Sequence, residues 1–289
     1  MELADLHAVI AVVEAGGVTR AAACLHRVPS SVTTRILRLE EALGVRLFAR
    51  QGKQMPCTPE GRTFYEYAKR IVALAQEAES QVRNVAPGGR FRIGAMESTA
   101  AGRLPKPLAQ LYAQHPRLEI ELTTGTSQAL YEKLFANRLD AALIADAPRN
   151  DSLETVAVFT EQLVLIAPEG HPDIRTPADI RNKTALAFRE GCSYRRRLLD
   201  WFHDHGDAPD RIAELASYHA ILGGVSAGMG VGVVPETVLR LFPAPQTLTT
   251  HALAPPYGAA TTELVWRKGM RSANVRALQV CLAGTAAAQ

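Results

Sequence analysis

The sequence lacks any apolar run of the ~18 to 20 residues that a membrane-spanning helix requires. Its start carries Glu2 and Asp5 where a secretory signal would carry Lys or Arg, so we expect no leader peptide. The four cysteines are far apart and form no C-x-x-C pair, which disfavours a zinc site and a disulfide scaffold. These absences predict a cytoplasmic protein with reduced cysteines.

Sequence motifs of several enzyme classes are missing as well. There is no G-x-S-x-G, P-loop or G-x-G-x-x-G, and the glycines of residues 228–232 have the wrong spacing for a phosphate loop. His203 and His205 lie near aspartates, but a spacing of two does not place both rings on one helical face, so we predict no metal site. We expect no cofactor and no enzyme; the alternative is a thiol- or serine-dependent enzyme that uses Cys192 or Ser193.

Positive charge is concentrated near the amino terminus. The chain of 289 residues has a formal net charge of only +3, yet residues 20–53 contain seven basic and two acidic side chains. Such a cluster is typical of a phosphate-binding surface. The alternative is a pair of basic helices that contacts a partner protein. The length allows two or three domains.

Residues 18–53 have the pattern of two short helices with a tight break between them. Pro29 ends the first helix because proline has no N–H and disfavours the α conformation in the preceding residue. We expect Ser30 and Ser31 to cap the second helix. Its buried face is the apolar stripe of Val32, Ile36, Leu39 and Leu43. The prediction is an all-α winged helix-turn-helix over residues 1–57, with a wing around residues 44–57.

The other faces of the second helix carry hydroxyl and guanidinium groups, which can reach base edges and phosphates in the major groove. The wing tip adds two more basic side chains. The residues that we expect to contact DNA are Arg20, Pro29, Ser30, Ser31, Thr33, Thr34, Arg35, Arg38, Arg50 and Lys53.

A long helix is predicted next, with Thr58 as its cap and Pro59 at its first position. Apolar residues recur every 3.5 positions on average, which is typical of a coiled-coil seam. A core helix is the alternative, but it usually has a wider apolar face. We predict a linker and hinge over residues 58–89 that forms a dimer through Phe64, Ala68, Ile71, Ala75, Ala78 and Val82.

Strands and helices alternate over residues 90–289, which indicates parallel sheets. We place one lobe at about residues 90–161 and 266–289, and a second at about 162–265. Two α/β lobes joined by two crossing strands describe a periplasmic-binding-protein-like fold, whose cleft closes on a small ligand by hinge motion.

Ligands of open α/β sheets bind at the carboxyl ends of strands, against helix amino termini. This rule selects short hydroxyls and free N–H groups, which suit a carboxylate or another anion. Of three consecutive arginines on one helix, we place Arg195 in the cleft and leave Arg196 and Arg197 outside. The predicted cleft residues are Ser98, Thr99, Thr126, Ser127, Cys192, Ser193, Tyr194, Arg195 and Met229.

Cys192 also has a chemical interpretation. A thiol beside a helix amino terminus and an arginine could have a lowered pKa and react with oxidants. No partner cysteine is evident near it in the sequence, so we favour a small lining residue.

Residues 21–61 follow an order that strongly resembles the amino-terminal domain of LysR-type transcriptional regulators. The motif consists of Ala21-Ala22, Leu25, Val32-Thr33, Ile36, Arg38-Leu39-Glu40, Leu43-Gly44-Val45, Leu47-Phe48-Ala49-Arg50 and Thr58-Pro59-Glu60-Gly61. Two positions depart from the family pattern: Gly17 replaces a capping Ser, and Pro29-Ser30-Ser31 replaces Gln-Pro-Ala. The layout of the remaining chain matches the family too.

The resemblance implies a transcription factor that binds an inverted-repeat-like operator as a dimer or tetramer, with its wing near the DNA backbone or the minor groove. A small effector, which we expect to be anionic, would close the two lobes, alter promoter bending and so change the recruitment of RNA polymerase. A redox-responsive regulator that acts through Cys192 is the alternative. A free solute-binding protein is disfavoured by the basic amino-terminal unit.

Overall fold

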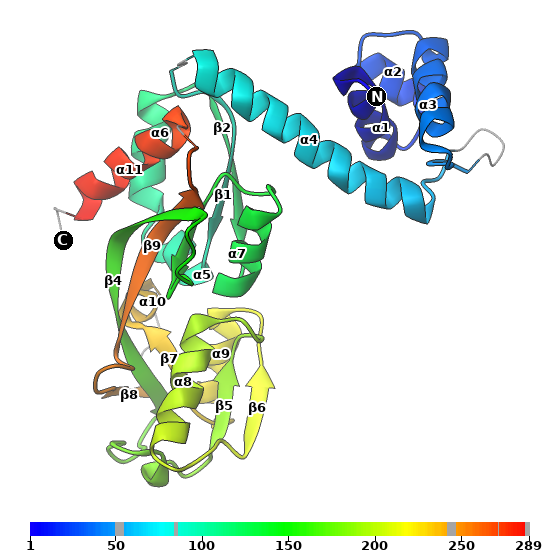
Figure 1. The fold of residues 1–289 in the computed structure, drawn as a ribbon. Helices are drawn as coiled ribbons and strands as arrows, with labels where there is room; N and C mark the ends of the chain where they lie inside the picture. Colours follow the sequence, from blue (N-terminus) through cyan, green and yellow to red (C-terminus); the bar gives the residue numbers. More distant parts are fainter. Residues whose placement is uncertain (50–54, 84–85, 242–246, 271, 287–289) are drawn as a thin grey trace. The chain divides into compact units, whose positions relative to one another are not determined.

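The computed structural model describes residues 1–49, 55–83, 86–241, 247–270 and 272–286. The chain divides into two compact units, Met1–Asn84 and Val85–Gln289. Figure 1 shows that helices alone build the first unit and that the second contains two lobes of strands and helices. The long linker helix packs on the first helix of its own unit, so the boundary follows that helix.

The first unit has the expected helix-turn-helix. Its helices are α1 (Leu3–Ala15), α2 (Val18–Cys24), α3 (Pro29–Leu43) and α4 (Pro59–Arg83). Val32, Ile36 and Leu39 are buried against α1 and α2, as their spacing predicts. Leu43 is 40% exposed because it lies in the last turn, so the predicted stripe is one residue too long.

The prediction of a serine cap on α3 is wrong. The helix begins at Pro29, and its N-cap is Val28, which makes no side-chain hydrogen bond to the helix. Proline suits this first position because its missing N–H would have no partner there in any case. Ser30 and Ser31 therefore lie inside the first turn, where they are free to face a ligand.

A buried carboxylate fastens the start of the wing to α3. Glu40 is only 6% exposed, and its Oε1 accepts the backbone N–H groups of Leu47 (2.7 Å) and Phe48 (3.0 Å). Phe48 then pairs with Cys57 in an antiparallel bridge, which is the geometry of a wing hairpin. The tip, with the predicted contacts Arg50 and Lys53, lies outside the described residues.

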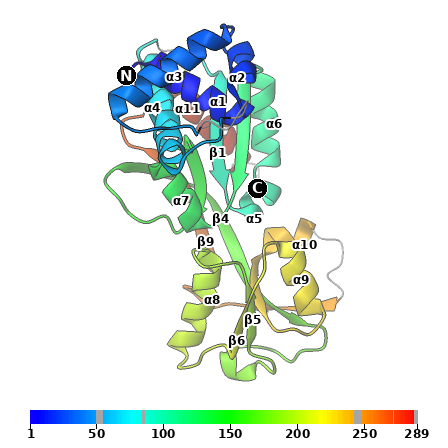
Figure 2. The same cartoon turned by 90° about the vertical axis from the view of Figure 1, so that its right-hand side faces the viewer.

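The second unit is organised around one mixed sheet. Its strands are β1 (Gly89–Ala95), β2 (Leu118–Thr124), β3 (Ala141–Ala145), β4 (Leu153–Pro168), β7 (Gly232–Pro235), β8 (Leu248–Ala252) and β9 (Ala259–Arg267). They follow the order β2-β1-β3-β9-β4-β7, with β8 also paired to β4. Figures 1 and 2 show the long β4 and β9 running from one lobe into the other. These are the two crossing strands that the sequence predicted.

The first three strands are parallel, as expected, but β9 runs antiparallel to both β3 and β4. Helices cover this lobe: α5 (Glu97–Gly102), α6 (Pro105–Gln114), α7 (Ser127–Phe135) and α11 (Ala273–Ala286). The second lobe adds the parallel pair β5 (Thr184–Ala187) and β6 (Arg211–Glu214), with α8 (Ser193–Asp204), α9 (Tyr218–Ser226) and α10 (Glu236–Leu241). The sequence analysis missed α10 and β8.

No single helix among the described residues is long and apolar enough to cross a membrane. The helices α1 and α2 pass that test only as a pair, and they are bent by 119° where they meet.

Candidate ligand cavity and nucleic-acid interface

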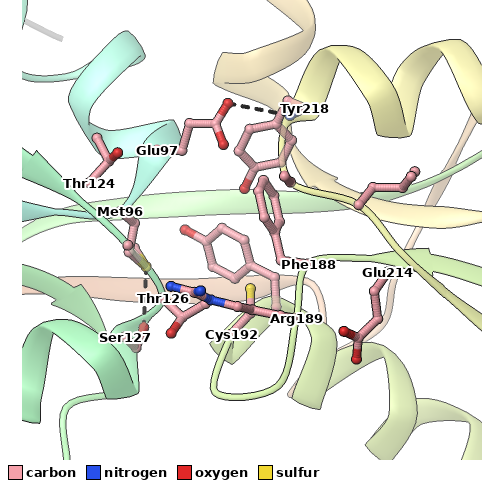
Figure 3. A pocket seen from close by; sticks show the side chains of 14 residues that line it. Met96, Glu97, Thr124, Thr126, Ser127, Phe188, Arg189, Cys192, Glu214 and Tyr218 are labelled. Carbon is pink, nitrogen blue, oxygen red and sulfur yellow. Dashed lines mark hydrogen bonds between the residues drawn. The ribbon is translucent and has the colours of Figure 1, made fainter.

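A cavity of about 450 Å³ lies between the two lobes. Both lobes supply its walls. The lining residues are Met96, Glu97, Thr124, Gly125, Thr126 and Ser127 from the first lobe, and Phe188, Arg189, Cys192, Tyr194, Glu214, Leu215, Ala216 and Tyr218 from the second. Figure 3 shows this shared lining from close by. A small molecule inside would therefore contact both lobes at once.

Four of the nine predicted cleft residues line this cavity: Thr126, Ser127, Cys192 and Tyr194. Thr126 is the N-cap of α7, and its Oγ1 accepts the N–H of Ala129 at 3.3 Å. Cys192 is the N-cap of α8. Each lobe thus contributes one helix amino terminus to the cavity, as the strand-end rule predicts.

Ser98, Thr99 and Ser193 are misplaced in the prediction. We expected Ser98 and Thr99 to line the cleft, but they lie in α5, where they are 1% and 0% exposed. Ser193 is 3% exposed, and its hydroxyl receives a hydrogen bond from Ser127 at 3.2 Å. These three residues are packed behind the lining residues, because the first turn of a helix directs some side chains back into the core.

Arg195 and Met229 are also corrected. Arg195 does not line the cavity; it forms an ion pair with Glu214 and donates to the carbonyl oxygen of Phe188. Met229 is 48% exposed in the turn after α9. Sequence spacing could not reveal that Glu214, on a neighbouring strand, would neutralise Arg195.

Of the two arginines that we left outside, only Arg196 is well exposed. Arg197 is 17% exposed and binds both carboxylate oxygens of Asp146, at 3.0 and 2.6 Å. Because Asp146 follows β3 in the first lobe and Arg197 lies on α8 in the second, this ion pair joins the lobes.

The sequence analysis missed the charged and aromatic lining residues Glu97, Phe188, Arg189 and Tyr218. Each of them adjoins a strand end or a helix start. Glu97 comes two residues after β1, and Arg189 comes two residues after β5. The same strand-end rule would have found them, had it been applied to every charged and aromatic residue at these positions and not chiefly to hydroxyls.

Glu97 contacts the opposite lobe directly. Its Oε1 accepts the backbone N–H of Tyr218, the first residue of α9, at 3.4 Å. Burial raises the pKa of Glu97, and that hydrogen bond together with the charge of His219 offsets only part of the increase. The carboxylate is therefore only partly compensated for its loss of water.

Further contacts beside the cavity connect the lobes. The N–H of Gln128 in α7 donates to the carbonyl oxygen of Gly191 at 3.2 Å, and Ser127 Oγ donates to Ser193 Oγ. Gly191 has a φ of 86°, and a Cβ at this position would lie 2.9 Å from the Gln128 Cβ. Glycine is thus needed where α7 approaches the second lobe.

A buried ion pair lies where β4 passes between the lobes. Glu161 is 1% exposed, and its carboxylate accepts from Arg103 of the first lobe at 2.7 and 3.2 Å. Thr237 of α10, in the second lobe, donates to the same carboxylate at 2.9 Å. Both oxygens of this charge are bound by groups of the same chain, so the network holds the crossing strand in place.

The environment of Cys192 does not favour a reactive thiolate. Burial raises its pKa above the ordinary value, and the nearby N–H groups and arginines offset only part of that effect. A raised pKa leaves less thiolate, the form that reacts with peroxide.

The expected DNA-binding residues fall into two groups. Ser30, Thr34 and Arg38 are exposed on α3. Within the part of the chain that the structure describes, their side chains form no hydrogen bond or ion pair. Thr33 instead donates to the carbonyl oxygen of Pro29 at 3.0 Å, and Arg35 binds Asp5 at 3.0 Å and Glu2 at 3.5 Å. Thr33 and Arg35 therefore form the second group, whose side chains are bound by residues of the amino-terminal unit itself.

The remaining predicted contacts, Arg20, Pro29 and Ser31, lie around the same turn. Arg20 and Pro29 are exposed and Ser31 is half-buried. The Arg20 guanidinium donates to the carbonyl oxygen of Gly16 at 3.3 Å, a weak bond that a phosphate could replace.

The apolar residues of α4 divide between two faces. Thr58 caps this helix, as predicted, by accepting the N–H of Gly61 at 2.9 Å. Phe64, Ala68 and Val72 pack on Leu6 and Ile10 of α1, so Phe64 and Ala68 are not available for a partner chain. This corrects two residues of the predicted seam.

A second apolar stripe on α4 is uncovered. Tyr67, Ile71 and Leu74 are 55%, 38% and 60% exposed, and Ala78 is exposed too. Their spacing of 4, 3 and 4 places them in one narrow line on the helix. Ala75 is half-buried, and the side chain of Val82 lies outside the described residues. We call Tyr67, Ile71, Leu74 and Ala78 the open stripe of α4.

Comparison with known families matches nearly the whole chain. A family profile described as "Bacterial regulatory helix-turn-helix protein, lysR family" matches residues 3–62, and "LysR substrate binding domain" matches residues 85–287. The uncharacterised HTH-type transcriptional regulator YusT of Bacillus subtilis is 35% identical over 93% of this chain and 90% of its own length. The HTH-type transcriptional regulator SoxR of Arthrobacter sp. is 32% identical over 92% of this chain and 91% of its own.

Solved structures share the fold. A full-length OxyR variant of Pseudomonas aeruginosa has a TM-score of 0.71 at 22% identity and covers 99% of this chain and 94% of that one. CbnR in complex with its target DNA has a TM-score of 0.69 at 24% identity, over 99% of this chain and all of the other. The relatives are named as transcriptional regulators, not as enzymes.

Proposed function

The chain belongs to the LysR family of transcriptional regulators, with a DNA-binding helix-turn-helix and an effector-binding domain, and from this we propose that a small molecule in the interlobe cavity controls its affinity for a promoter. The observation that carries the proposal is the shared lining of that cavity. A ligand that contacts both lobes stabilises one interlobe arrangement over others, and only such a difference in affinity can shift a conformational equilibrium.

We propose that the effector carries an anionic group. Thr126 and Ser127 at the start of α7, the amino terminus of α8 and the guanidinium of Arg189 surround one side of the cavity. Helix amino termini and arginines stabilise negative charge. Arg189 takes the place that we first assigned to Arg195, whose charge is already paired with Glu214.

For DNA recognition, we propose that α3 enters the major groove with Ser30, Thr34 and Arg38 toward the bases and phosphates. These side chains are exposed, and no side-chain hydrogen bond or ion pair ties them to a described residue of their unit. Arg35 has acidic partners in its own unit, so we assign it to the positioning of α3 on α1.

We propose that the open stripe of α4 forms the dimer. A line of exposed Tyr, Ile and Leu side chains is costly in water, and a second copy of the helix would cover it. Dimerisation would place two α3 helices at one operator, and closure of the lobes would change how the paired helices engage it and how RNA polymerase is recruited.

The test combines binding and DNA affinity in the full-length protein. A thermal-shift screen of small metabolites identifies an effector, since a ligand at 100 times its Kd adds about 2.7 kcal/mol to the free energy of unfolding. An operator is selected from random duplexes, and its affinity is measured by fluorescence anisotropy with and without the effector. We expect the effector to change operator affinity several-fold.

Two matched alanine variants locate the binding site. Phe188→Ala removes a wall of the cavity and should weaken effector binding at least tenfold. Met229→Ala removes an exposed apolar side chain outside the cavity. This variant should bind the effector with a Kd within twofold of the wild-type value. An effector that binds both variants equally, or that binds without changing operator affinity, contradicts the proposal.

A further inference from the structure

The interlobe cavity has opposite charges on two of its walls. Figure 3 shows Glu97 next to Tyr218, and Arg189 on the side where Thr126, Ser127 and Cys192 lie. Both charged side chains line the cavity; no salt bridge with a described residue involves Arg189, and Glu97 has the charge of His219 in its surroundings without a salt bridge to it. A cavity with one negative and one positive side chain is complementary to a ligand that carries one positive and one negative group.

The wall at Arg189 fits a carboxylate. The helix α7 has nine residues and α8 has twelve, and both begin at this wall. Thr126, the N-cap of α7, lines the cavity and is 8% exposed; its Oγ1 accepts the N–H of Ala129, which leaves the hydroxyl hydrogen to be donated to a ligand. The partial positive charges of both helix ends add to the full charge of Arg189.

The wall at Glu97 fits a cation. The carboxylate accepts one N–H, at 3.4 Å, and burial raises its pKa because the remaining lone pairs have lost water. The rings of Phe188 and Tyr218 stand edge to face beside it, with centroids 4.8 Å apart. Aromatic faces attract an ammonium group, and this attraction is stronger where water is excluded.

A third group in the lining also needs a partner. The Tyr194 side chain lines the cavity and is 3% exposed, yet its hydroxyl has no hydrogen-bond partner among the described residues. Burial raises the pKa of Tyr194, and the nearby Ser98 hydroxyl offsets part of that increase although the two hydroxyls do not reach hydrogen-bond geometry. Buried hydroxyls are nearly always hydrogen-bonded, so this one indicates a polar ligand atom.

We propose that the effector is a zwitterion of the amino-acid or betaine class, with its ammonium group at Glu97 and the aromatic rings and its carboxylate at Arg189 and the start of α7. This inference rests on the proposed function and adds a second, cationic group to the anionic one. It excludes dicarboxylates, which would bring negative charge to Glu97. It also assigns Glu97 and Arg189 separate roles, which can be tested separately.

The experiment uses the full-length protein and defined probes. The twenty proteinogenic amino acids and glycine betaine are screened by thermal shift, and the strongest binder is compared by calorimetry with its two single-charge analogues. For phenylalanine, for example, these are 2-phenylethylamine, which lacks the carboxylate, and 3-phenylpropanoate, which lacks the ammonium. We expect the zwitterion to bind at least tenfold more tightly than either analogue, since each charge-assisted contact contributes about tenfold or more.

Two substitutions test which cavity residue binds the ammonium group of the ligand and which binds its carboxylate. Glu97→Gln should weaken the zwitterion about tenfold and leave the deaminated acid unchanged or tighter, whereas Arg189→Gln should weaken the zwitterion and leave the decarboxylated amine unchanged. Glu190→Gln and Arg149→Gln serve as controls. They remove one negative and one positive charge, respectively, at exposed positions that do not line the cavity.

The outcomes separate this inference from the proposed function. A deaminated acid or a dicarboxylate that binds as tightly as any zwitterion, with Glu97→Gln without effect, overturns the zwitterion and keeps an anionic effector in the cavity. If the twenty-one zwitterions all fail to bind the wild type, the inference is also wrong. A ligand that binds equally well to Phe188→Ala refutes the cavity itself, and with it both proposals.

Discussion

Two carboxylates of the effector-binding unit, Glu161 at the crossing of the lobes and Glu97 in the cavity, have very different surroundings. Glu161 is 1% exposed and binds Arg103 and Thr237 from opposite lobes. Glu97 accepts the N–H of Tyr218 at 3.4 Å, and the charge of His219 offsets only part of the effect of its burial. A charge that its own chain satisfies holds the fold, whereas a charge left partly open is available to a ligand.

The same contrast appears in the amino-terminal unit. Arg35 has two acidic partners on or beside α1, while Arg38, on the same helix, has none among the described residues. On α4, Ala68 is covered by α1, while Leu74 is 60% exposed. In each pair, one member stabilises the unit and the other is exposed, where we propose that DNA or a second chain binds.

The largest expected effect is at the lobe crossing. Arg103→Ala leaves the buried charge of Glu161 without its partner, which should lower the free energy of unfolding by about 3 to 5 kcal/mol. Urea unfolding of the full-length protein measures it. Arg175→Ala, which removes an exposed ion pair with Asp173, should lower the free energy of unfolding far less, because water screens exposed ion pairs. Equal losses for the two variants would show that the Glu161 network is not structural.

Next in size is the dimer. Leu74→Asp places a charge in the open stripe of α4 and should weaken dimerisation by more than about 2 kcal/mol, because the charge would lose its water in the interface. Light scattering at micromolar concentration detects the monomer. Lys69→Asp puts an aspartate on another face of the same helix and should leave the dimer intact. If the dimer persists in Leu74→Asp but is lost in Lys69→Asp, the dimer interface lies on another face of α4 and not on the open stripe.

A smaller effect is expected for DNA. Arg38→Ala should weaken operator binding by about 1 to 3 kcal/mol if it contacts a base, or reduce the salt dependence by about one charge if it contacts a phosphate. Arg35→Ala should affect operator affinity less and thermal stability more, because its partners are Glu2 and Asp5. The reverse ranking in anisotropy titrations at matched salt would move the DNA contact from Arg38 to Arg35.

The smallest effect is the pH dependence of Glu97. Its pKa is raised by folding, so the ionised form is less favourable in the folded than in the unfolded protein. This cost is absent well below the unfolded pKa of about 4.3 and grows as pH rises through the raised folded value. Glu97→Gln should therefore raise Tm slightly at pH 7, and the difference should shrink as pH falls toward and below the unfolded pKa of about 4.3. A lower Tm for the variant at pH 7 would make Glu97 structural, like Glu161.

The fold could be predicted from sequence to a large extent because its main signals are local. The stripe of Val32, Ile36 and Leu39 and the alternation of strands and helices report on neighbouring residues. The errors arise where a residue far away in the sequence determines the partner or the burial of a side chain. Arg195 was expected in the cleft until Glu214, nineteen positions away, proved to be its partner, and Ala68 was expected in the seam until α1 proved to cover it. Glu97 and Arg189 were missed because the choice at the strand ends favoured hydroxyls and, among charged residues, took only Arg195.

The link between the cavity and the DNA is tested most directly by reciprocity. Coupling between two sites is one free energy, so the factor by which the effector changes operator affinity must equal the factor by which operator changes effector affinity. Calorimetry of the full-length protein with its effector, with and without saturating operator duplex, measures the second factor. We predict that effector Kd changes by the same several-fold factor as operator Kd. An effector Kd that is unaffected by operator would show that the cavity does not control DNA binding.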